Sequence, residues 1–511
     1  MENVSRRMLL TGAAASLGTV ALTTAGAAPA AAAPTPQEES LGITNVASFG
    51  AAGDGTLVRT ELVAAIAAAG QGGVVYFPPG VYLVDQPLAP LDRQTWIGIP
   101  GVSVIKSVSG VVGFTLIDAR DIPNSFRLEG LVIDGNRSQT TNPGFVYPTT
   151  SSEIPGVGLL VLAQPHAREV QVRDSVFLNL WNYGIVAQRF ADNGSLSLTV
   201  KASRVSDAGG GLAAFKTTSL TVVESTFEDT TEQGIWGQHC QNVLVQGNDS
   251  YRHDFHGIVF TYSAHVQILS NHCVGNGKGP GKFGWGICMG GTSLLDQPNH
   301  TISVVGNVCH LNGSGGITHD PRWPSSTATH SQKVAISGNV CTSDGVIGIN
   351  GISSNFGRDM AVTGNFVSGF PFHGLNLSNS TYTTVTGNVS TGNGKGIAIE
   401  SLPAGPEGPY GHVVVSSNMI YENTVDYHIP EYPDGRQIDI VVMEPRNQLR
   451  VSAQTVGFFG VEPAAQPTGW AASMYDEKRE LEKKAPKVVK DTNQVLATLI
   501  SDLKRLGVLG G

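Results

Sequence analysis

The sequence predicts an all-β solenoid of about ten coils of parallel strands, and two recurring phrases carry this prediction. The first phrase alternates polar and apolar residues; its copies end at Asn248, Asn271, Asn307, Asn339, Asn365, Asn388 and Asn418, and degenerate copies end at Ser175, Ser203 and Ser225. The second phrase, built around Gly-Ile or Gly-Leu, often follows nine residues later. A period of roughly 20 to 50 residues indicates stacked units, and alternation with a period of two indicates strands.

Residues 1–33 are predicted to be an export signal. Arg6 and Arg7 stand before an apolar stretch, and small residues suited to a signal peptidase follow up to Ala33. This arrangement resembles a twin-arginine signal. The stretch is rich in Gly, Thr and Ala, so we expect cleavage rather than a membrane anchor. The sequence therefore predicts a secreted or cell-surface protein exported by the twin-arginine pathway.

The composition is that of a turn-rich globular chain with an acidic charge balance. The chain has 63 glycines, 27 prolines, 14% charged residues and a formal net charge of −9. An acidic exported chain binds nucleic acid and anionic membranes poorly, so no partner of either kind is expected. Its five cysteines are too dispersed for a disulfide framework and include no C-x-x-C pair. We therefore expect buried reduced thiols, no metal site and no cofactor.

The first coils carry a recognisable opening. "ITNVASFGAAGDGT" is followed by the Ala-rich helix "ELVAAIAAAG" and by "GGVVYFPPGVYLV". This opening resembles that of the pectate-lyase-like superfamily of right-handed parallel β-helix proteins, which includes pectate lyases, polygalacturonases, inulin fructotransferases and phage tailspikes. The resemblance extends over about residues 43 to 450 and implies a right-handed parallel β-helix domain, taken as residues 34–450. It also implies an N-terminal capping helix that covers the open end of the first coil.

The resemblance does not define a reaction, because one fold carries many chemistries. Val58, Arg59, Thr60 and Glu61 stand where such openings usually carry an aspartate. The Asn-Thr-Asp, Asp-Asp and Arg-Ile-Lys set of the polygalacturonases is not found. The hydrolase residues of that group are therefore not carried over to this chain.

Each coil is expected to be fastened by its asparagine and lined by apolar side chains. Asparagine tolerates a left-handed turn and can hydrogen-bond to its own copy one coil away. Cys273, Cys309 and Cys341 each lie two residues after an asparagine, so they are predicted to stack inward as one column.

The repeat stops near residue 450, and residues 451–511 are predicted to form a C-terminal extension. A charged segment precedes a helix whose apolar stripe consists of Leu496, Leu499, Leu503 and Leu506. This helical tail packs on the coil stack in one interpretation. In the other it forms a homotrimer, as in tailspike-like chains.

Alternation along the Gly-Ile phrase predicts a strip of outward-facing side chains. If the residue after the glycine points inward, the residues two and four after the glycine point outward. Aromatic, amide and imidazole side chains gather on this strip and its margins, and they suit sugar rings and hydroxyl groups. We therefore predict a polysaccharide or oligosaccharide substrate bound by Trp236, Gln238, Tyr262, Trp285, His319, Trp323, Asn350 and Asn376.

Acidic residues along the strip are the catalytic candidates. Asp254 and Asp320 belong to coils two steps apart, which separates them by about 10 Å along the axis, near the spacing of inverting glycosidases. Glu232, one coil before Asp254, would form a closer pair of the retaining kind. His256 could orient either acid. A purely structural role, in which these side chains cap backbone amides, is the alternative.

Three functions remain open from the sequence. The paired carboxylates favour a glycoside hydrolase or an intramolecular glycosyl transferase. A polysaccharide lyase acting on uronates would need a basic residue, often with calcium, but the cations Lys216, Arg252, Arg322 and Lys395 are expected to be scattered and no acidic trio has calcium-ligand spacing. A non-catalytic, tailspike-like glycan-binding protein is the third possibility.

Overall fold

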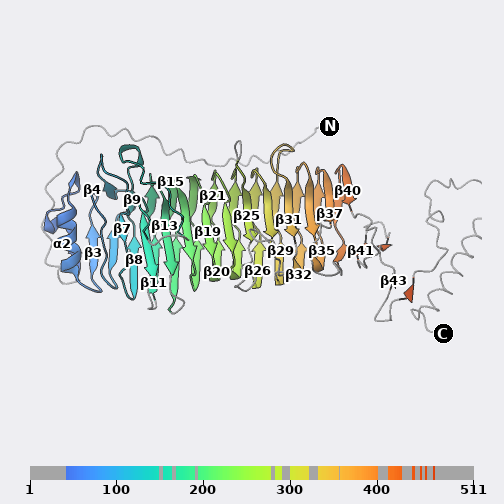
Figure 1. Cartoon of the computed structure of the whole chain (residues 1–511), viewed down its shortest axis with the longest axis horizontal. Helices are drawn as coiled ribbons and strands as arrows, with labels where there is room; N and C mark the ends of the chain where they lie inside the picture. The colour runs from blue at the N-terminus through green and yellow to red at the C-terminus, as the bar shows by residue number, and fades with distance from the viewer. Residues whose placement is uncertain are drawn as a thin grey trace, which may run out of the picture.

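The structure is a computed structural model in which the chain forms a long stack of coils. It describes residues 42–148, 153–163, 168–189, 194–277, 282–290, 300–320, 332–355, 357–400, 413–428, 440–443, 449–451, 455–456 and 464–465. Within these residues nearly every element is a strand, and the strands form three long sheets, here named A, B and C, that run along the stack (Figure 1). The predicted parallel β-helix is therefore confirmed.

Sheet A is the longest sheet and is parallel except at its last strand, β42, which pairs antiparallel with β41. Its strands, in order, are β1 (Ile43–Asn45), β3 (Val74–Phe77), β5 (Thr95–Gly98), β8 (Ser125–Glu129), β11 (Arg168–Arg173), β14 (Leu196–Lys201), β17 (Ser219–Val223), β20 (Gln241–Gln246), β23 (Ala264–Leu269), β26 (His300–Val305), β29 (Gln332–Ser337), β32 (Arg358–Thr363), β35 (Thr381–Thr386), β38 (Val413–Ser416), β41 (Ile440–Met443) and β42 (Leu449–Val451).

Sheet B follows sheet A in each coil, and in the later coils the recurring serine or asparagine stands between the two strands. Its strands, in order, are β2 (Asp54–Leu57), β4 (Gly80–Val84), β6 (Ser103–Ser107), β9 (Val132–Asp134), β12 (Val176–Leu178), β15 (Arg204–Ala208), β18 (Thr226–Thr230), β21 (Asp249–Tyr251), β24 (His272–Val274), β27 (Val308–His310), β30 (Val340–Thr342), β33 (Phe366–Ser368), β36 (Val389–Thr391) and β39 (Met419–Tyr421).

Sheet C carries the Gly-Ile phrases and completes each coil. Its strands, in order, are β7 (Ile117–Asp118), β10 (Leu159–Ala163), β13 (Tyr183–Arg189), β16 (Gly210–Phe215), β19 (Ile235–Gln238), β22 (Ile258–Thr261), β25 (Trp285–Gly290), β28 (Gly315–Asp320), β31 (Asn350–Asn355), β34 (His373–Ser378), β37 (Lys395–Glu400) and β40 (Val425–His428). Two short strands, β43 (Thr455–Val456) and β44 (Ala464–Ala465), pair apart from these sheets.

The stack holds more coils than the predicted ten. Four strands of sheet A, from β1 to β8, precede the first recurring phrase, and sheet B alone contains 14 strands. These early coils alternate apolar and polar residues like the others, but Pro78, Ile99 and Leu131 stand at the turn positions where the later coils carry serine or asparagine. A count based on those phrases therefore missed them.

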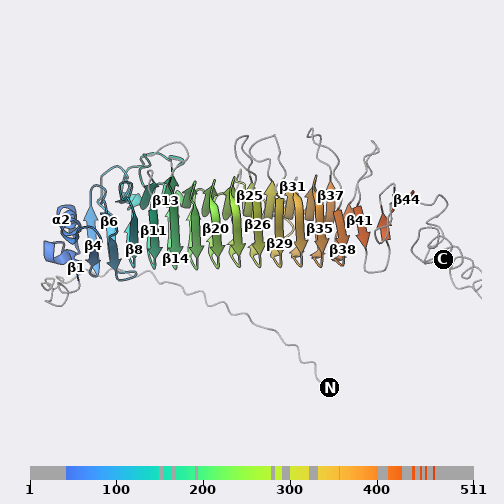
Figure 2. The same ribbon diagram turned by 90° about the horizontal axis from the view of Figure 1, so that it is seen from below.

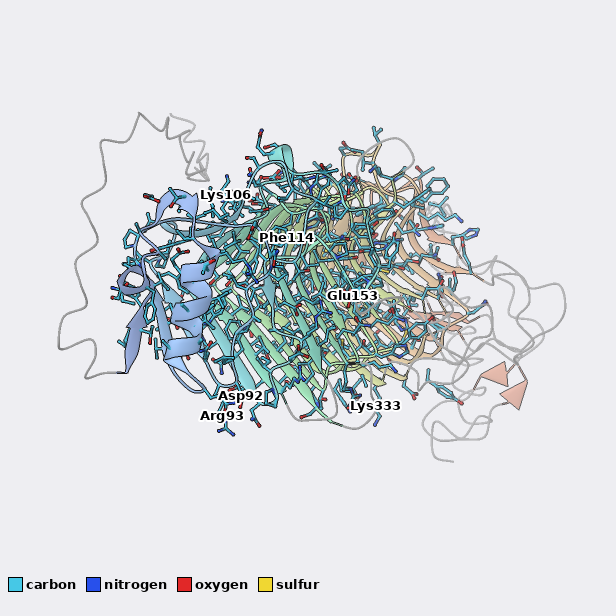
Figure 3. All side chains as sticks on the ribbon, turned by 60° about the vertical axis from the view of Figure 1, so that its left-hand side comes forward. Asp92, Arg93, Lys106, Phe114, Glu153 and Lys333 are labelled. Atoms are coloured by element: carbon cyan, nitrogen blue, oxygen red, sulfur yellow. The ribbon has the colours of Figure 1, made fainter. Side chains whose placement is uncertain are left out.

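The N-terminal end of the stack is covered by helix α2 (Arg59–Ala69), as predicted. The helix buries Leu62, Ala65 and Ile66 against the first coils and ends at Gly70. Short 3-10 turns flank the early coils, at Val46–Phe49 and Arg137–Gln139. Figure 3 shows α2 lying across the end of the stack, with Lys106 at one edge and Asp92, Arg93 and Lys333 at the opposite edge.

The column of asparagines forms a hydrogen-bonded ladder inside the turn between sheets A and B. Asn307 is typical: its amide nitrogen donates to the side-chain oxygen of Asn339 at 3.0 Å, and its own side-chain oxygen accepts from Asn271. The predicted bond from each copy to the next is confirmed. The left-handed conformation, however, belongs to the preceding residue, for example Gly306 or Ser270, and not to the asparagine.

The core between the sheets is apolar and includes the predicted cysteine column. Cys273, Cys309 and Cys341 are fully buried and lie in register on β24, β27 and β30. All five cysteines are free thiols. Burial of each thiol next to apolar neighbours stabilises the stack as a small aliphatic side chain would.

Two predicted segments lie outside the described residues. They are the export signal of residues 1–33 and the leucine-striped helix of the C-terminal extension, and both stay predictions. Among the residues that the structure does describe, no helix is long and apolar enough to span a membrane.

Candidate active site on the outer face of sheet C

The register of sheet C places the predicted outward residues on one face. Ile235, Ile258 and Ile287 are in register on neighbouring strands and belong to the main core. The residues that follow them, such as Trp236 and Val259, therefore point away from the core. Trp236, Gln238 and Asn376 thus lie on the outer face, as the alternation predicted.

Asn350 reaches the site from a different position than the one expected. The sequence aligned Gly348 with the glycines of the other coils, but Ile352 pairs with Ile317 and Leu375, so Gly351 is the equivalent residue. The segment before β31 is three residues longer than the nine-residue spacing suggested. Asn350 consequently precedes the glycine and pairs with His373.

His319 is not on the binding strip, contrary to the prediction. It lies between the outward residues Thr318 and Asp320, so its ring points into the core, where Nδ1 hydrogen-bonds with the Ser354 hydroxyl at 3.1 Å. Burial lowers the pKa of His319 to about 4. The ring is sealed from substrate by its own strand. Trp323, another predicted binding residue, lies outside the described residues.

A cluster of reactive side chains lies where sheet B turns into sheet C. Glu232, Asp254 and Lys282 come from three successive coils, just before β19, β22 and β25. The Lys282 ammonium group pairs with the Asp254 carboxylate. The hydroxyl of Tyr147, from the long segment between β9 and β10, donates to Glu232 Oε1 at 2.9 Å. We call these four residues the acid cluster.

The two carboxylates of the acid cluster have different surroundings. Burial raises the pKa of Glu232, the charge of Asp254 raises it further, and the Tyr147 hydroxyl and Lys282 oppose these effects without cancelling them. Asp254 has a cation as its direct partner. Burial and Glu232 together raise the pKa of Tyr147 to about 12.

His256 stands beside this cluster as a neutral hydrogen-bonding group. Its Nδ1 accepts from the backbone N–H of Trp285 at 3.1 Å, and burial lowers its pKa to about 4. A neutral ring whose Nδ1 accepts carries its proton on Nε2. His256 can therefore donate a hydrogen bond but is a poor general acid at neutral pH.

Aromatic side chains close one side of the acid cluster. The Trp236 ring packs edge-on against Phe215 at 4.7 Å between centroids and lies 6.2 Å from Tyr147. Tyr183 and Phe145 extend the group. We call these five residues the aromatic wall. The predicted binding residues Trp285 and Gln238 lie half-buried near it.

The remaining predicted residues are spread along the same face. Tyr262 follows β22 at its far end, where its ring stacks on His239 at 4.8 Å. Asp320 is at the end of β28 and accepts from Asn355 at 2.9 Å. In register it stacks over Gly290 and Thr261, whereas Asp254 precedes β22. The two aspartates therefore lie at opposite ends of the sheet C strands. The separation expected from the sequence counted only the distance along the axis and not this offset along the strands.

A second polar cluster lies farther along the stack and was not predicted as a unit. Glu400 Oε1 receives Lys395 at 2.7 Å and lies 3.3 Å from His373 Nε2 and 3.7 Å from His428 Nε2. His373 Nδ1 is 2.7 Å from the side-chain oxygen of Asn350. Burial raises the pKa of Glu400, but its three basic neighbours outweigh burial and hold it below the usual value. We call this group the Glu400 cluster.

The sequence analysis did not identify Tyr147 or Lys282 as site residues. Both residues lie in segments that interrupt the repeat: the region between β9 and β10, and the long interval from Asn271 to Asn307. An unusually long interval signals an inserted loop, but not where the loop goes. The structure brings Lys282 to Asp254 and Lys395 to Glu400, while Arg252 pairs with Asp229 away from the strip.

Within the described ranges, no three His, Cys, Asp or Glu side chains are grouped so that they could hold a metal ion. The nearest approach is His373, His428 and Glu400, but Lys395 binds the same carboxylate oxygen. An ammonium group at that oxygen competes with a metal ion for it.

Three family models match consecutive parts of the chain. They are "Rhamnogalacturonase A/epimerase, pectate lyase-like" over residues 43–152, "Right handed beta helix region" over 158–320 and "Periplasmic copper-binding protein (NosD)" over 292–438. None of them extends over half of the chain. Together with the sheets, these matches identify a right-handed parallel β-helix.

Individual proteins with similar sequence or structure point to the same fold. Mannuronan C5-epimerase AlgE1 of Azotobacter vinelandii is 26% identical over 290 residues, which is 53% of this chain but only 18% of that protein. The A-module of mannuronan C-5 epimerase AlgE6 from the same organism is 19% identical, with a TM-score of 0.50 over 78% of this chain and 99% of the module. The Dettilon tailspike protein is 15% identical, with a TM-score of 0.50 over 76% of this chain and 69% of the tailspike.

Proposed function

We propose that this right-handed parallel β-helix protein is a carbohydrate-active enzyme that cleaves glycosidic bonds, with Glu232 and Asp254 as its catalytic pair. The observation that carries the proposal is the contrast between two neighbouring carboxylates. Glu232 has a raised pKa and a hydroxyl partner, and Asp254 has an ammonium partner. A carboxyl group with a raised pKa beside a second, ion-paired carboxylate is an arrangement that can supply a general acid next to a nucleophile.

The spacing of the pair favours the retaining mechanism. Residues on adjacent coils are about 4.8 Å apart along the axis, close to the roughly 5–5.5 Å between the carboxyl groups of retaining enzymes. In this mechanism Asp254 attacks the anomeric carbon while Glu232 gives its proton to the leaving oxygen. Glu232 then removes a proton from water, which hydrolyses the glycosyl-enzyme ester. If a hydroxyl of the same glycan replaces water, the result is intramolecular transfer.

Lys282 and the aromatic side chains support this assignment. The ammonium group holds Asp254 in position and lowers the cost of the charge that it carries. Trp236 and Trp285 offer flat apolar surfaces for sugar rings. Asp320 accepts from Asn355 at the opposite end of the sheet C strands from the acid cluster, so we assign it to substrate binding rather than to the bond-breaking step.

A second candidate function is chemistry on uronates, and one observation favours it. Lys282 is a cation inside the acid cluster, where it could neutralise a sugar carboxylate and make the neighbouring C5 proton easier to remove. Return of a proton to the other face would be epimerisation, and loss of the leaving sugar would be β-elimination. The names of the relatives from Azotobacter vinelandii also support this candidate.

The test is to incubate the purified protein with mannuronan, polygalacturonate, a fructan and neutral glucans in ¹⁸O-labelled water and in D₂O. Hydrolysis places ¹⁸O in a new reducing end, transfer gives an unlabelled anhydro product, elimination produces ultraviolet absorbance, and epimerisation incorporates deuterium at C5. Glu232→Gln and Asp254→Asn are each expected to reduce turnover by about 10³-fold or more. Glu224→Gln, which changes an exposed carboxylate on another face, is the matched control.

Two results would count against the proposal. Full turnover by both variants would remove the acid cluster from the reaction. Binding of a glycan without any product would favour the tailspike-like binding protein instead. The predicted export signal of residues 1–33 would also place the protein outside the cytoplasm, which fractionation of producing cells would check.

A further inference from the structure

The outer face of sheet B changes character along the stack. The second residue of each of its later strands points into the core, as Cys309 does, so the first residue points outward. From β15 to β24 this outward residue is polar or charged, and from β27 to β39 it is apolar. The polar residues are Arg204, Thr226, Asp249 and His272. The apolar residues, which we call the apolar row, are Val308, Val340, Phe366, Val389 and Met419.

The apolar row is exposed along its whole length. Val340, Phe366 and Met419 are 37%, 38% and 59% exposed, and the other two members are half-buried. The fold does not require apolar residues here, because the four coils before β27 carry polar residues at the same register position. A contiguous exposed row of apolar side chains marks a contact surface.

The turn beside the apolar row bears few side chains. After β26, β29, β32 and β35 the turn to sheet B is two residues long and consists of a glycine and the ladder asparagine. A Cβ atom added at one of these glycines, Gly338, would meet nothing within 4 Å. The row is therefore accessible to a bulky partner from the side of sheet A.

The leucine-striped helix predicted in the C-terminal extension matches the apolar row in length and chemistry. Leu496 and Leu506 are ten positions apart, which is about 15 Å along a helix axis. The five strands of the row span about 19 Å, at roughly 4.8 Å per strand. Packing one apolar stripe along the other would remove both from water.

The chain leaves the stack at the same end as the apolar row. Met419 lies on β39, the last strand of sheet B, and the chain continues through β41 and β42 at that end of sheet A (Figure 2). Leu496 follows Val451, the last residue of β42, by 45 positions. A flexible chain of this length spans roughly 35–40 Å, which is enough to return along the row.

We propose that residues 496–506 pack as a helix along the apolar row of the same molecule, with the helix axis parallel to the stack. The four leucines then cover Phe366 and its neighbours. This inference is independent of the proposed function, because no member of the acid cluster belongs to the row. A second copy of the chain seated on the row is the alternative that the tests separate.

The first test is disulfide trapping in the whole chain. Phe366→Cys, at the centre of the row, is combined with Leu499→Cys or with Leu503→Cys, which lie near the centre of the helix whichever way it runs. Oxidation with diamide is expected to give an intramolecular disulfide in at least one double variant, identified by peptide mass spectrometry. The native cysteines are buried and so do not compete.

The matched control combines Leu503→Cys with Thr226→Cys. Thr226 holds the same outward position five strands earlier, about 24 Å from Phe366, so this pair should stay reduced. Disulfides between two molecules of Phe366→Cys would make a second copy the occupant and overturn the proposal. A lack of disulfide in both double variants, or an equal yield in the control, would overturn it as well.

The second test is the rate of trypsin cleavage at Lys504 and Arg505, which lie inside the predicted helix. Phe366→Asp and Met419→Asp place a charge on the apolar row and leave the tail unchanged. Each should raise this rate about tenfold, because cleavage follows the population of released helix. Thr226→Asp, on the polar part of sheet B, should not change it. Equal rates in the native protein and in both row variants would contradict docking of the helix.

Discussion

Glu232 and Asp254 lie on neighbouring coils, but Glu232 has a neutral hydroxyl as its partner and Asp254 has a positively charged ammonium group. A buried carboxyl next to a hydroxyl donor and a second carboxylate titrates later than usual, as the raised pKa of Glu232 shows. A carboxylate beside an ammonium group has its charge compensated in place. At the scale of single residues, the acid cluster therefore has the asymmetry that acid catalysis requires.

Tyr147→Phe tests that asymmetry through its pH profile. The hydroxyl donates to Glu232 and so stabilises the ionised form; without it the pKa of Glu232 rises further. Because the proposed acid must be protonated, kcat/KM falls as pH rises through this pKa. The alkaline limb of the profile should therefore move to higher pH, by about one unit.

The control for this shift is Tyr421→Phe, which changes an exposed tyrosine on sheet B. Its profile should match that of the native protein. An alkaline limb that stays in place in Tyr147→Phe, or moves to lower pH, would mean that Glu232 is not the acid.

At the scale of elements, the turn between sheets A and B is held by the asparagine ladder. Each side chain donates to a backbone carbonyl of the preceding coil and exchanges bonds with its copies on both sides, as Asn307 does with Ile268, Asn271 and Asn339. Buried backbone groups at a turn must find partners within the protein. The ladder supplies them at the same place in every coil, which keeps the strands in register.

Asn307→Ala should weaken the middle of the stack. It removes the acceptor of the Asn271 backbone N–H, one of the two acceptors of the Asn271 side-chain amide and the donor to the Ile268 carbonyl, at a total cost of about 3 kcal/mol. Denaturant unfolding followed by circular dichroism measures the loss. Gln246→Ala, at an exposed position of the same sheet, should change stability by less than about 0.5 kcal/mol. Equal denaturation midpoints for the two variants would contradict a stabilising role of the asparagine ladder.

At the scale of the whole molecule, a parallel solenoid has two ends whose strands lack neighbours. Unpaired strand edges bind other chains unless they are covered. The α2 helix covers the first coil, and Leu62, Ala65 and Ile66 are its buried residues. The helix contacts the stack through few buried side chains. We therefore expect the protection of this strand edge against association to depend on those side chains.

Leu62→Asp should detach this cover. A buried, unpaired carboxylate is costly enough to displace the helix from the stack, while the interior coils keep their own contacts. We expect near-native circular dichroism together with concentration-dependent association in light scattering. Val63→Asp changes the exposed neighbour and should remain monodisperse. Unchanged scattering in Leu62→Asp would show that the helix does not protect the edge.

The sequence by itself determined the coil. Short strands, a period of two, the inward Cys column and the asparagine ladder follow from local patterns that each coil repeats, because neighbouring coils impose the same environment on equivalent positions. It also identified Glu232, Asp254 and His256 as residues at one edge of sheet C. It misplaced Asn350, because three extra residues before β31 shift that coil relative to the repeat. It also misplaced His319, because neighbouring residues on a strand point to opposite faces and His319 points into the core.

Only the tertiary structure decided what surrounds those residues. Tyr147 bonds with a carboxylate 85 positions away in the chain, and Lys282 and the apolar cover of β10 to β16 come from segments that interrupt the repeat. Inserted segments have lengths and paths that no repeat constrains, so periodicity places their ends but not their side chains. The surroundings of Glu232 depend on those side chains, and for that reason they become visible only in the folded molecule.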